Sequence, residues 1–390
     1  MKTSTDHILT THVGSLPRPD AVVAQLLRKE RGETVDQGEF DAVMREGVAA
    51  IVSHQVALGL DVVSDGETAK ISYATYIKDR YTGFETEGEV SPKPHLDLRE
   101  HPDFVKRMAA FTGPRTARRP CCGAAITLRD RAPLTADIAN LKAALPTDGS
   151  ASGFLNAASP GVVSAFLPNR HYPTHEAYIE ALAEALRHEY EAITAAGLTL
   201  QVDCPDLAMA RHTGFQDLSE AEFLARAALH VEALNHALAK VPREQVRIHI
   251  CWGNYEGPHD HDIPVERILP IVLKAKAQAI LFEGANPRHE HEWTVWRDTK
   301  LPDDLILVPG VIDSCSNYVE HPELIAQRIE RYTAIVGRER VIAGSDCGFG
   351  TFAGYGKVDA GIAWKKLAAL CEGARIASRR LGLDHPSGRP

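Results

Sequence analysis

Long apolar runs are missing from this sequence. No stretch reaches about 18 consecutive apolar residues, which is the length that a helix needs to cross a membrane. The first residues, MKTSTDHILTTHVGS, also lack the apolar core of a secretion signal. We therefore expect a cytoplasmic protein that has no membrane partner.

Basic runs and cysteines are also scarce. The longest basic runs are ARRP and SRR, and the formal net charge is −9, so the chain lacks the positive surface that binds a phosphate backbone. We expect no nucleic-acid partner. Seven cysteines, an odd number, in a chain of 390 residues do not make a disulfide framework. They are expected to be reduced thiols, metal ligands or core residues.

The composition is that of a normal globular protein, with 44% hydrophobic and 24% charged residues. A length of 390 residues allows two domains, but a single α/β barrel of this size is also common. From residue 198 onward, short apolar runs alternate with amphipathic segments of helical length, which is typical of βα units around a parallel sheet. The predicted strands of this half are 198–205, 245–254, 279–287, 304–313 and 340–350.

The first half of the chain adds three strand candidates, each ending in a turn marked by Gly or Pro, at 8–17, 61–67 and 153–160. Eight strand candidates favour a (β/α)8 barrel over an open doubly wound sheet. Residues 78–150 fit this alternation poorly, and we interpret them as a hairpin-like insertion after the second strand. The sequence therefore predicts a single catalytic domain over 1–390, an α/β protein of the TIM-barrel type with an insertion at about 78–150.

The ends of the predicted strands carry polar and metal-binding residue types. In barrels of this kind the active site lies at the carboxyl ends of the strands. In chain order these ends hold Gly14–Ser15, Asp65–Glu67, Ser159, Asp203–Cys204, His249–Cys251, Glu283, Asp313 and Asp346–Cys347. We therefore expect the active site on this rim of the barrel.

Four of these residues form a candidate zinc site. His249 and Cys251 are two positions apart, so both side chains point to the same face of a strand. Glu283 follows the next strand, and Cys347 follows the last one. Zinc accepts sulfur, nitrogen and oxygen ligands together. On spacing alone, Cys251 and Cys347 could equally be small buried hydrophobic residues near strand ends.

Seven short motifs, taken in order, resemble the catalytic half of cobalamin-independent methionine synthase. They are THVGSLPRP, SDGE, QVDCPD, HIC, FEGANPR, PGVID and GSDCGFGT, and the resemblance covers about residues 8–370. It is to the shorter single-barrel relatives, which include methionine synthase II-like proteins and epoxyalkane:coenzyme M transferases. The resemblance implies zinc ligands at His249, Cys251, Glu283 and Cys347, and contacts with a thiol substrate at Gly14, Ser15, Glu67 and Asp203.

In this family a small thiol is activated by zinc, because the thiolate is the nucleophile and the metal removes the thiol proton. We expect a zinc-dependent S-methyltransferase that converts homocysteine to methionine. Glu67 and Asp203 would bind the amino group of the thiol substrate, and the backbone near Gly14 and Ser15 its carboxylate. A thiol with a sulfonate group, as in an epoxyalkane:coenzyme M transferase-like opening of an epoxide, would instead use Arg18, Lys70 or Arg211.

The sequence does not identify the alkyl donor, which could be methylfolate, a methylcorrinoid, another methylated small molecule or an epoxide. Methionine synthases have a histidine two residues after the aspartate of GV-x-D, where it helps to protonate the folate leaving group, and Cys315 stands there in this chain. A cysteine with an ordinary pKa of about 8.5 is a poor acid for this step, which argues against methylfolate. We take Asp313 and His321 as the candidate catalytic residues. His321 is the candidate proton donor, and its position equally suits the start of the helix that follows. These expectations are also compatible with a homo-oligomer.

Two further interpretations stay open. The H-x-H pairs His259/His261 and His289/His291 could form a second metal site, or lie on the rim without a metal. The barrel could also hold zinc for structure alone, or be a metal-free barrel of the decarboxylase type. Glu283 argues against a purely structural zinc, because a carboxylate is the weakest of the four zinc ligands and a substrate thiolate could displace it.

Overall fold

The computed structural model describes residues 1–85, 93–112 and 119–383. Its centre is a sheet of eight parallel strands. From the second strand on, each strand pairs with the next of the eight along the chain, and the last pairs with the first. The strands are β1 (Leu9–Thr10), β2 (Val62–Ser64), β5 (Ser152–Ala158), β6 (Thr199–Asp203), β7 (Val246–His249), β8 (Ala279–Phe282), β9 (Ile306–Ile312) and β10 (Ile342–Ser345).

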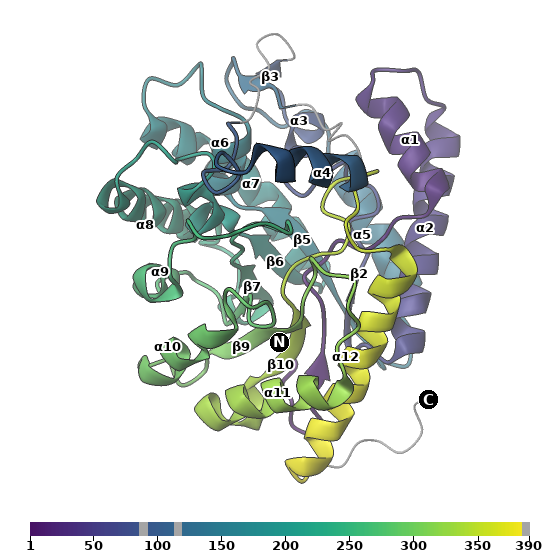
Figure 1. Cartoon of the computed structure of the whole chain (residues 1–390). Coiled ribbons are helices and arrows are strands. Elements are labelled where there is room, and N and C mark those ends of the chain that lie inside the picture. Colours follow the sequence, from purple (N-terminus) through teal and green to yellow (C-terminus); the bar gives the residue numbers. More distant parts are fainter. Residues whose placement is uncertain (86–92, 113–118, 384–390) are drawn as a thin grey trace.

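Hydrogen bonds between the first two strands close this sheet into a barrel. The amide of Asp61 donates to the carbonyl of Thr10 at 3.2 Å, and the hydroxyl of Thr11 donates to the carbonyl of Val62 at 3.0 Å. Figure 1 shows the strands at the centre of the molecule with helices around them. The predicted (β/α)8 barrel is confirmed.

Helices cover the outer face of the barrel (Figure 1). They are α1 (Asp20–Glu30), α2 (Gln37–Leu58), α5 (Ala132–Ala144), α6 (Pro160–Phe166), α7 (His175–Ala195), α8 (Glu220–Ala237), α9 (Val265–Val272), α10 (Trp293–Asp298), α11 (Pro322–Val336) and α12 (Ala360–Arg380). Local residues set their ends. Asp36 caps the start of α2 and the left-handed Gly59 ends it, while Ser219 and Glu222 form a capping box at the start of α8.

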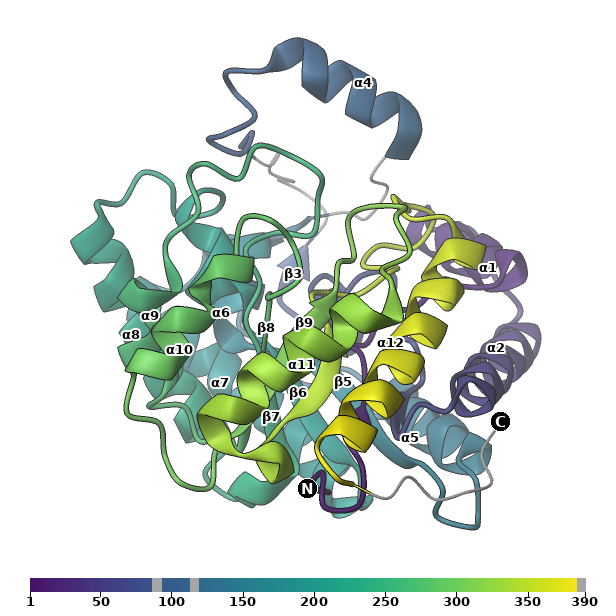
Figure 2. The same ribbon diagram turned by 60° about the horizontal axis from the view of Figure 1, so that its bottom comes forward.

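A short excursion follows β2 and precedes β5. It contains α3 (Ile77–Arg80), β3 (Phe84–Glu85), α4 (Pro102–Thr112) and β4 (Cys121–Cys122). Strands β3 and β4 pair antiparallel, with Phe84 opposite Cys122, so the hairpin-like insertion after the second strand is confirmed. In Figure 2, α4 stands apart from the other helices, beyond the end of the barrel at which α12 begins. Helix α5 packs against α2 and belongs to the outer helix layer.

Alternate residues of the strands divide between two apolar clusters. Ile280 and Leu307 join the large cluster between the sheet and the helices, whereas Leu281 and Val308 join a smaller cluster on the other face of the sheet. This is the alternation expected of strands whose two faces are both buried. Within the described part of the chain, no helix combines the length and the apolar character that a bilayer crossing requires.

The register of β5, β6 and β7 arranges buried polar side chains in two levels. Asn156 pairs with Gln201, and Gln201 with Arg247; two residues further along, Asp203 pairs with His249. All five residues are buried. Because residues two apart on a strand point to the same face, Asp203 and His249 lie above the amide and guanidinium groups, at the carboxyl end of the barrel.

Candidate metal centre and substrate cavity

Three side chains with metal-binding atoms meet at the carboxyl end of the barrel. One ring nitrogen of His249 and the sulfur atoms of Cys251 and Cys347 all lie within 4.8 Å of one another, and the two sulfur atoms are 3.7 Å apart. His249 ends β7, and Cys347 lies two residues beyond the end of β10. All three residues are buried. The barrel thus brings together three of the four predicted ligands.

The spacing of these donors fits a zinc ion. Two thiolates that bind one tetrahedral zinc at about 2.3 Å lie about 3.8 Å from each other, and the sulfurs of Cys251 and Cys347 are 3.7 Å apart. The contact with Cys347 and burial raise the pKa of Cys251. A bound cation would offset this cost of ionisation, because the thiolate is the form that binds a metal. Three protein donors are typical of a catalytic zinc site, which keeps one position open.

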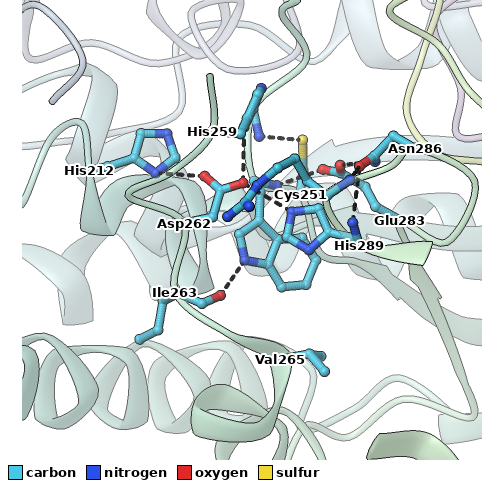
Figure 3. Close-up of polar contacts among 12 residues, drawn as sticks. His212, Cys251, His259, Asp262, Ile263, Val265, Glu283, Asn286 and His289 are labelled. Carbon is cyan, nitrogen blue, oxygen red and sulfur yellow. Dashed lines mark hydrogen bonds and ion pairs between the residues drawn. The ribbon is translucent and has the colours of Figure 1, made fainter. Parts of the chain in front are cut away.

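Glu283, the fourth predicted ligand, lies beside this cluster and outside it. It directly follows β8, and both of its oxygens already accept hydrogen bonds. Oε1 accepts from the backbone amide of Trp252 at 2.8 Å, and Oε2 accepts from Nδ2 of Asn286 at 2.7 Å (Figure 3). Each carboxylate oxygen retains a second lone pair, so these hydrogen bonds orient Glu283 without using up its capacity to bind a metal.

Asp203 is held by two amides from inside the barrel. Its Oδ1 accepts from Nε2 of Gln201 at 2.8 Å, and its Oδ2 accepts from Nδ2 of Asn156 at 2.9 Å. Oδ1 also lies 3.5 Å from Nδ1 of His249. A carboxylate behind a metal-binding histidine fixes the orientation of the ring. Sequence reasoning missed Asn156 and Gln201, although a polar amide within an otherwise apolar strand was a visible signal.

A cavity opens next to the three donors. One wall is aromatic, because the ring of Tyr73 packs edge-on against Phe166 and Phe352, with ring centroids 5.5 Å and 5.8 Å apart. The polar residues that line the cavity include three of the predicted substrate contacts, Ser15, Glu67 and Asp203. The cavity therefore joins a polar, metal-binding region to an apolar wall.

Glu67 presents an unpaired carboxylate oxygen. Its backbone is left-handed, with φ of 55°, and its amide donates to Oδ1 of Asp65 at 2.9 Å. Oε2 is buried and has no hydrogen-bond partner among the described residues. Burial, opposed by the charge of Lys70 and assisted by that of Asp203, raises the pKa of Glu67 to about 8. A strained backbone and an unsatisfied buried oxygen are both typical of a ligand-binding position.

Gly14, the remaining predicted substrate contact, has a steric role. Its φ is 142°, and a Cβ at this position would lie 2.3 Å from Oδ1 of Asn156, so only glycine fits. Its amide donates to Nδ1 of His12 at 3.1 Å. Ser15 follows it on the cavity wall. The structure thus places Ser15 at the cavity, with Gly14 allowing Asn156 to approach the chain.

The three basic residues predicted to bind a sulfonate, Arg18, Lys70 and Arg211, are not among the described residues that line this cavity. Arg18 donates to three backbone carbonyl groups, and Lys70 donates to one. Two other basic residues, Lys93 and Arg119 of the insertion, line the cavity instead. Lys93 forms an ion pair with Asp217.

A second cavity shares Cys347 with the first and is also lined by Glu283, Asp313 and Cys315. Asp313 accepts hydrogen bonds from the amides of Cys315 and Ser316, both at 2.9 Å. Burial raises the pKa of Cys315, which makes it a still weaker acid. His321 is exposed and caps the start of α11, where its Nδ1 accepts from the amide of Glu323. It is absent from the described lining of both cavities.

Comparison with known proteins agrees with this architecture. The sequence pattern described as "Cobalamin-independent synthase, Catalytic domain" matches residues 8–91 and 131–360. A 2-hydroxypropyl-CoM lyase from Xanthobacter autotrophicus is 26% identical over 409 aligned residues, covering 96% of each chain. A methionine synthase from Saccharolobus solfataricus is 24% identical over 376 residues, covering 95% of each chain.

The fold is also shared with a solved structure. A B12-independent methionine synthase from Shewanella sp. W3-18-1, in complex with selenomethionine, superposes with a TM-score of 0.72 at 18% sequence identity. The alignment covers 96% of this chain and 99% of that one. The likeness extends over the whole barrel.

Proposed function

This chain belongs to the family of cobalamin-independent synthase catalytic domains, and on that premise we propose that it is a zinc-dependent thiol alkyltransferase. The reaction that fits best is transfer of a methyl group to homocysteine, giving methionine. Barrel and insertion together would form one catalytic domain. The observation that carries this proposal is the cluster of His249, Cys251 and Cys347, which opens into a cavity beside the unpaired oxygen of Glu67.

In this proposal His249, Cys251 and Cys347 hold the metal, and Glu283 is the exchangeable fourth ligand. When bound there, zinc would lower the pKa of a coordinating thiol, so that the thiol reacts as its thiolate. Asp203 keeps the ring of His249 in place. The cluster favours a catalytic metal over a purely structural one. Glu283 lies outside the three close donors, so the fourth position on the metal could be taken by a substrate thiolate. Two thiols and an imidazole at metal-binding distance also argue against a metal-free decarboxylase.

Recognition of the acceptor would fall to the acidic side of the cavity. An amino-acid thiol carries an ammonium group, which can donate to the free oxygen of Glu67 and lie beside Asp203. The backbone near Gly14 and Ser15 remains our proposed contact for its carboxylate. A sulfonate next to Glu67 and Asp203 would meet two acidic groups, and the nearby bases Arg18 and Lys70 already donate to carbonyl groups. Of the two basic residues on the cavity wall, Lys93 forms an ion pair with Asp217, and the Arg119 guanidinium lies over the ring of Phe166. We therefore favour homocysteine over a sulfonated thiol.

The transfer step requires a path for the leaving group. A sulfur lone pair forms the new bond to carbon, and the carbon–donor bond breaks with its electron pair going to the donor, which then takes up a proton. Of the two proposed catalytic residues, Asp313 lines the second cavity, whereas His321 caps α11 at the surface. We propose Asp313 as the residue that transfers this proton to the leaving group, and His321 as the alternative.

A second candidate reaction is the opening of an epoxide by the same thiolate. It is favoured by the 26% identity to a 2-hydroxypropyl-CoM lyase over nearly the whole chain, and by the aromatic wall of the cavity, which suits an apolar electrophile. Both reactions use the same metal and differ in the acceptor and the electrophile.

A donor screen tests the proposal. Zinc-loaded protein is incubated with homocysteine or coenzyme M and with a methylfolate, a methylcorrinoid, an S-methyl sulfonium compound or a small epoxide, and loss of thiol is followed. We expect methionine from homocysteine with one of the methyl donors. A thioether formed only from coenzyme M and epoxides would favour the second reaction. No thiol consumption in protein that contains zinc would contradict both.

The metal part of the proposal has its own measurement. Cys251→Ser and Cys347→Ser should each remove bound zinc, measured by elemental analysis of protein purified with zinc, while the far-UV circular dichroism stays that of the wild type. The buried Cys371 in α12 offers a matched control, since it lies away from the cluster and Cys371→Ser should keep its zinc. Stoichiometric zinc in both variants would mean that the ligands are misassigned.

A further inference from the structure

One histidine of each H-x-H pair, His259 and His289, contacts a buried aspartate, Asp262. Nδ1 of His259 and Nε2 of His289 lie 2.9 Å and 3.0 Å from Oδ2 of Asp262 (Figure 3). His212 approaches from the other side, with its Nδ1 3.3 Å from Oδ1 of the same carboxylate. The side chain of Asp262 is only 2% exposed. This cluster lies among three loops, which follow β6, β7 and β8.

Both ring nitrogens of His259 and of His289 face acceptors. Besides Asp262, His289 contacts Oε2 of Glu292 at 2.8 Å, and His259 contacts the carbonyl oxygen of Tyr255 at 2.8 Å. An imidazole that donates from both nitrogens is protonated. Although burial opposes it, hydrogen bonding to Asp262 and Glu292 raises the pKa of His289 to about 10. Two imidazolium groups and two carboxylates therefore form a buried network of ion pairs.

This arrangement leaves no free lone pair on His259 or His289 to bind a metal. Their partners in the H-x-H pairs, His261 and His291, are exposed. Among the described residues, the pairs therefore do not form the second metal site that their spacing allowed. Their function has to be sought in what the network holds in place.

The network reaches the metal centre through Trp252, the residue that follows Cys251. The Trp252 ring packs on His289 with the ring centroids 4.4 Å apart, and its indole nitrogen donates to the carbonyl of Ile263 at 2.6 Å. The backbone amide of the same residue donates to Oε1 of Glu283 at 2.8 Å. Trp252 is thus fixed by the network on one side and fixes Glu283 on the other.

We propose that His259, His289 and Asp262 are positioning residues of the metal centre, which hold the loops that carry Cys251 and Glu283 at the spacing that the metal requires. This inference rests on the zinc site proposed above. Burying charged groups costs desolvation free energy, but a buried network in which every group is paired can hold several loops in one arrangement. Here it joins the β7–α9 loop to the β8–α10 loop, and these two loops supply two of the four proposed ligands.

The two H-x-H pairs supply matched controls for the test. His259→Gln and His289→Gln remove one network residue each, whereas His261→Gln and His291→Gln make the same change at an exposed neighbour two residues away. For each protein we would measure the zinc dissociation constant by competition with a chromophoric chelator, and the thermal midpoint of the metal-free form. The network variants should bind zinc about 10- to 100-fold more weakly, and the control variants should bind it as the wild type does.

The thermal midpoint separates positioning from plain stability. Network variants that melt earlier but bind zinc with wild-type affinity would overturn the inference and leave the proposed function intact. Wild-type protein that binds no zinc would overturn both. If a glutamine variant does not fold, Asp262→Asn, which keeps the shape of the side chain and loses its charge, is judged by the same two measurements.

Discussion

At the scale of single residues, the cavity contains two carboxylates in opposite circumstances. Both oxygens of Asp203 accept hydrogen bonds from amides of the barrel interior. Glu67 keeps one oxygen without a partner among the described residues, on a backbone with φ of 55°. Asp203 is thus committed to the protein and its metal-binding histidine, while Glu67 is available to a ligand.

Above about pH 8, where Glu67 is ionised, replacing Glu67 with Gln should weaken the binding of methionine, the proposed product, about 10- to 100-fold. A hydrogen bond to a charged group contributes about 1.5–3 kcal/mol, and each 1.4 kcal/mol is about a factor of ten. Since the pKa of Glu67 is raised to about 8, the residue is mostly protonated below that pH and ionised above it. Wild-type affinity for methionine should therefore rise as the pH passes through about 8, and that of the variant should not.

Isothermal calorimetry on both sides of that pH measures this effect. Coenzyme M, which has no amino group, is the control ligand, because its binding should not require Glu67. Equal methionine affinity in the wild type and in Glu67→Gln at all pH values would exclude Glu67 as the contact for the amino group.

At the scale of the elements, the site depends on how closely β9 approaches the end of β10. A Cβ on Gly310 of β9 would lie 1.9 Å from Oδ1 of Asp346 and 2.6 Å from its Cα. The same Oδ1 accepts hydrogen bonds from the amides of Gly284 and Ala285, at 2.8 Å and 2.9 Å. Asp346 therefore joins the ends of three strands, and the next residue in the chain is Cys347.

Gly310→Ala should displace Asp346 and disturb the metal centre. Forcing extra volume into a packed site costs about 1–3 kcal/mol, and the displacement would move Cys347 away from Cys251. We expect a lower urea midpoint and a lower zinc content. Gly356→Ala is the control, since the nearest atom to its new Cβ would be 3.9 Å away. Wild-type stability and zinc content in Gly310→Ala would mean that the strand ends can separate without cost.

At the scale of the whole molecule, the apolar packing of the barrel and the metal centre are separate sources of stability. The main apolar cluster extends around the molecule between sheet and helices and does not include Cys251 or Cys347. A fold with this much internal packing does not need a metal to form, unlike the small domains that metals hold together.

Removing zinc should therefore lower stability without unfolding the chain. A ligand present at about 100 times its dissociation constant stabilises the folded state by about 2.7 kcal/mol. Chelation should remove that amount, measured by urea unfolding with and without zinc, and the far-UV circular dichroism should not change. Cys251→Ser should show no response to zinc. A metal-free wild type that has lost its secondary structure would contradict the separation of core and site.

Much of this architecture could be predicted from the sequence, because the patterns that specify it are local. A strand such as 279–287 shows itself by an apolar run that ends in a polar turn, and a helix such as α8 by its capping residues and periodicity. Residues two apart on a strand share a face whatever the rest of the chain does. The eight strands, and the rim residues at their ends, followed from such patterns.

The tertiary structure alone decided which of these residues meet. From their spacing, His259 and His261 were equally good candidates for a metal site. In the fold, His259 is buried against Asp262 where three loops pack together, whereas His261 is exposed. The sequence likewise left His321 open between donating a proton and beginning the next helix, and the fold places it at the start of α11. Local sequence encodes the element and the face of a residue. Its neighbours depend on contacts between segments far apart in the chain, which only the packed fold specifies.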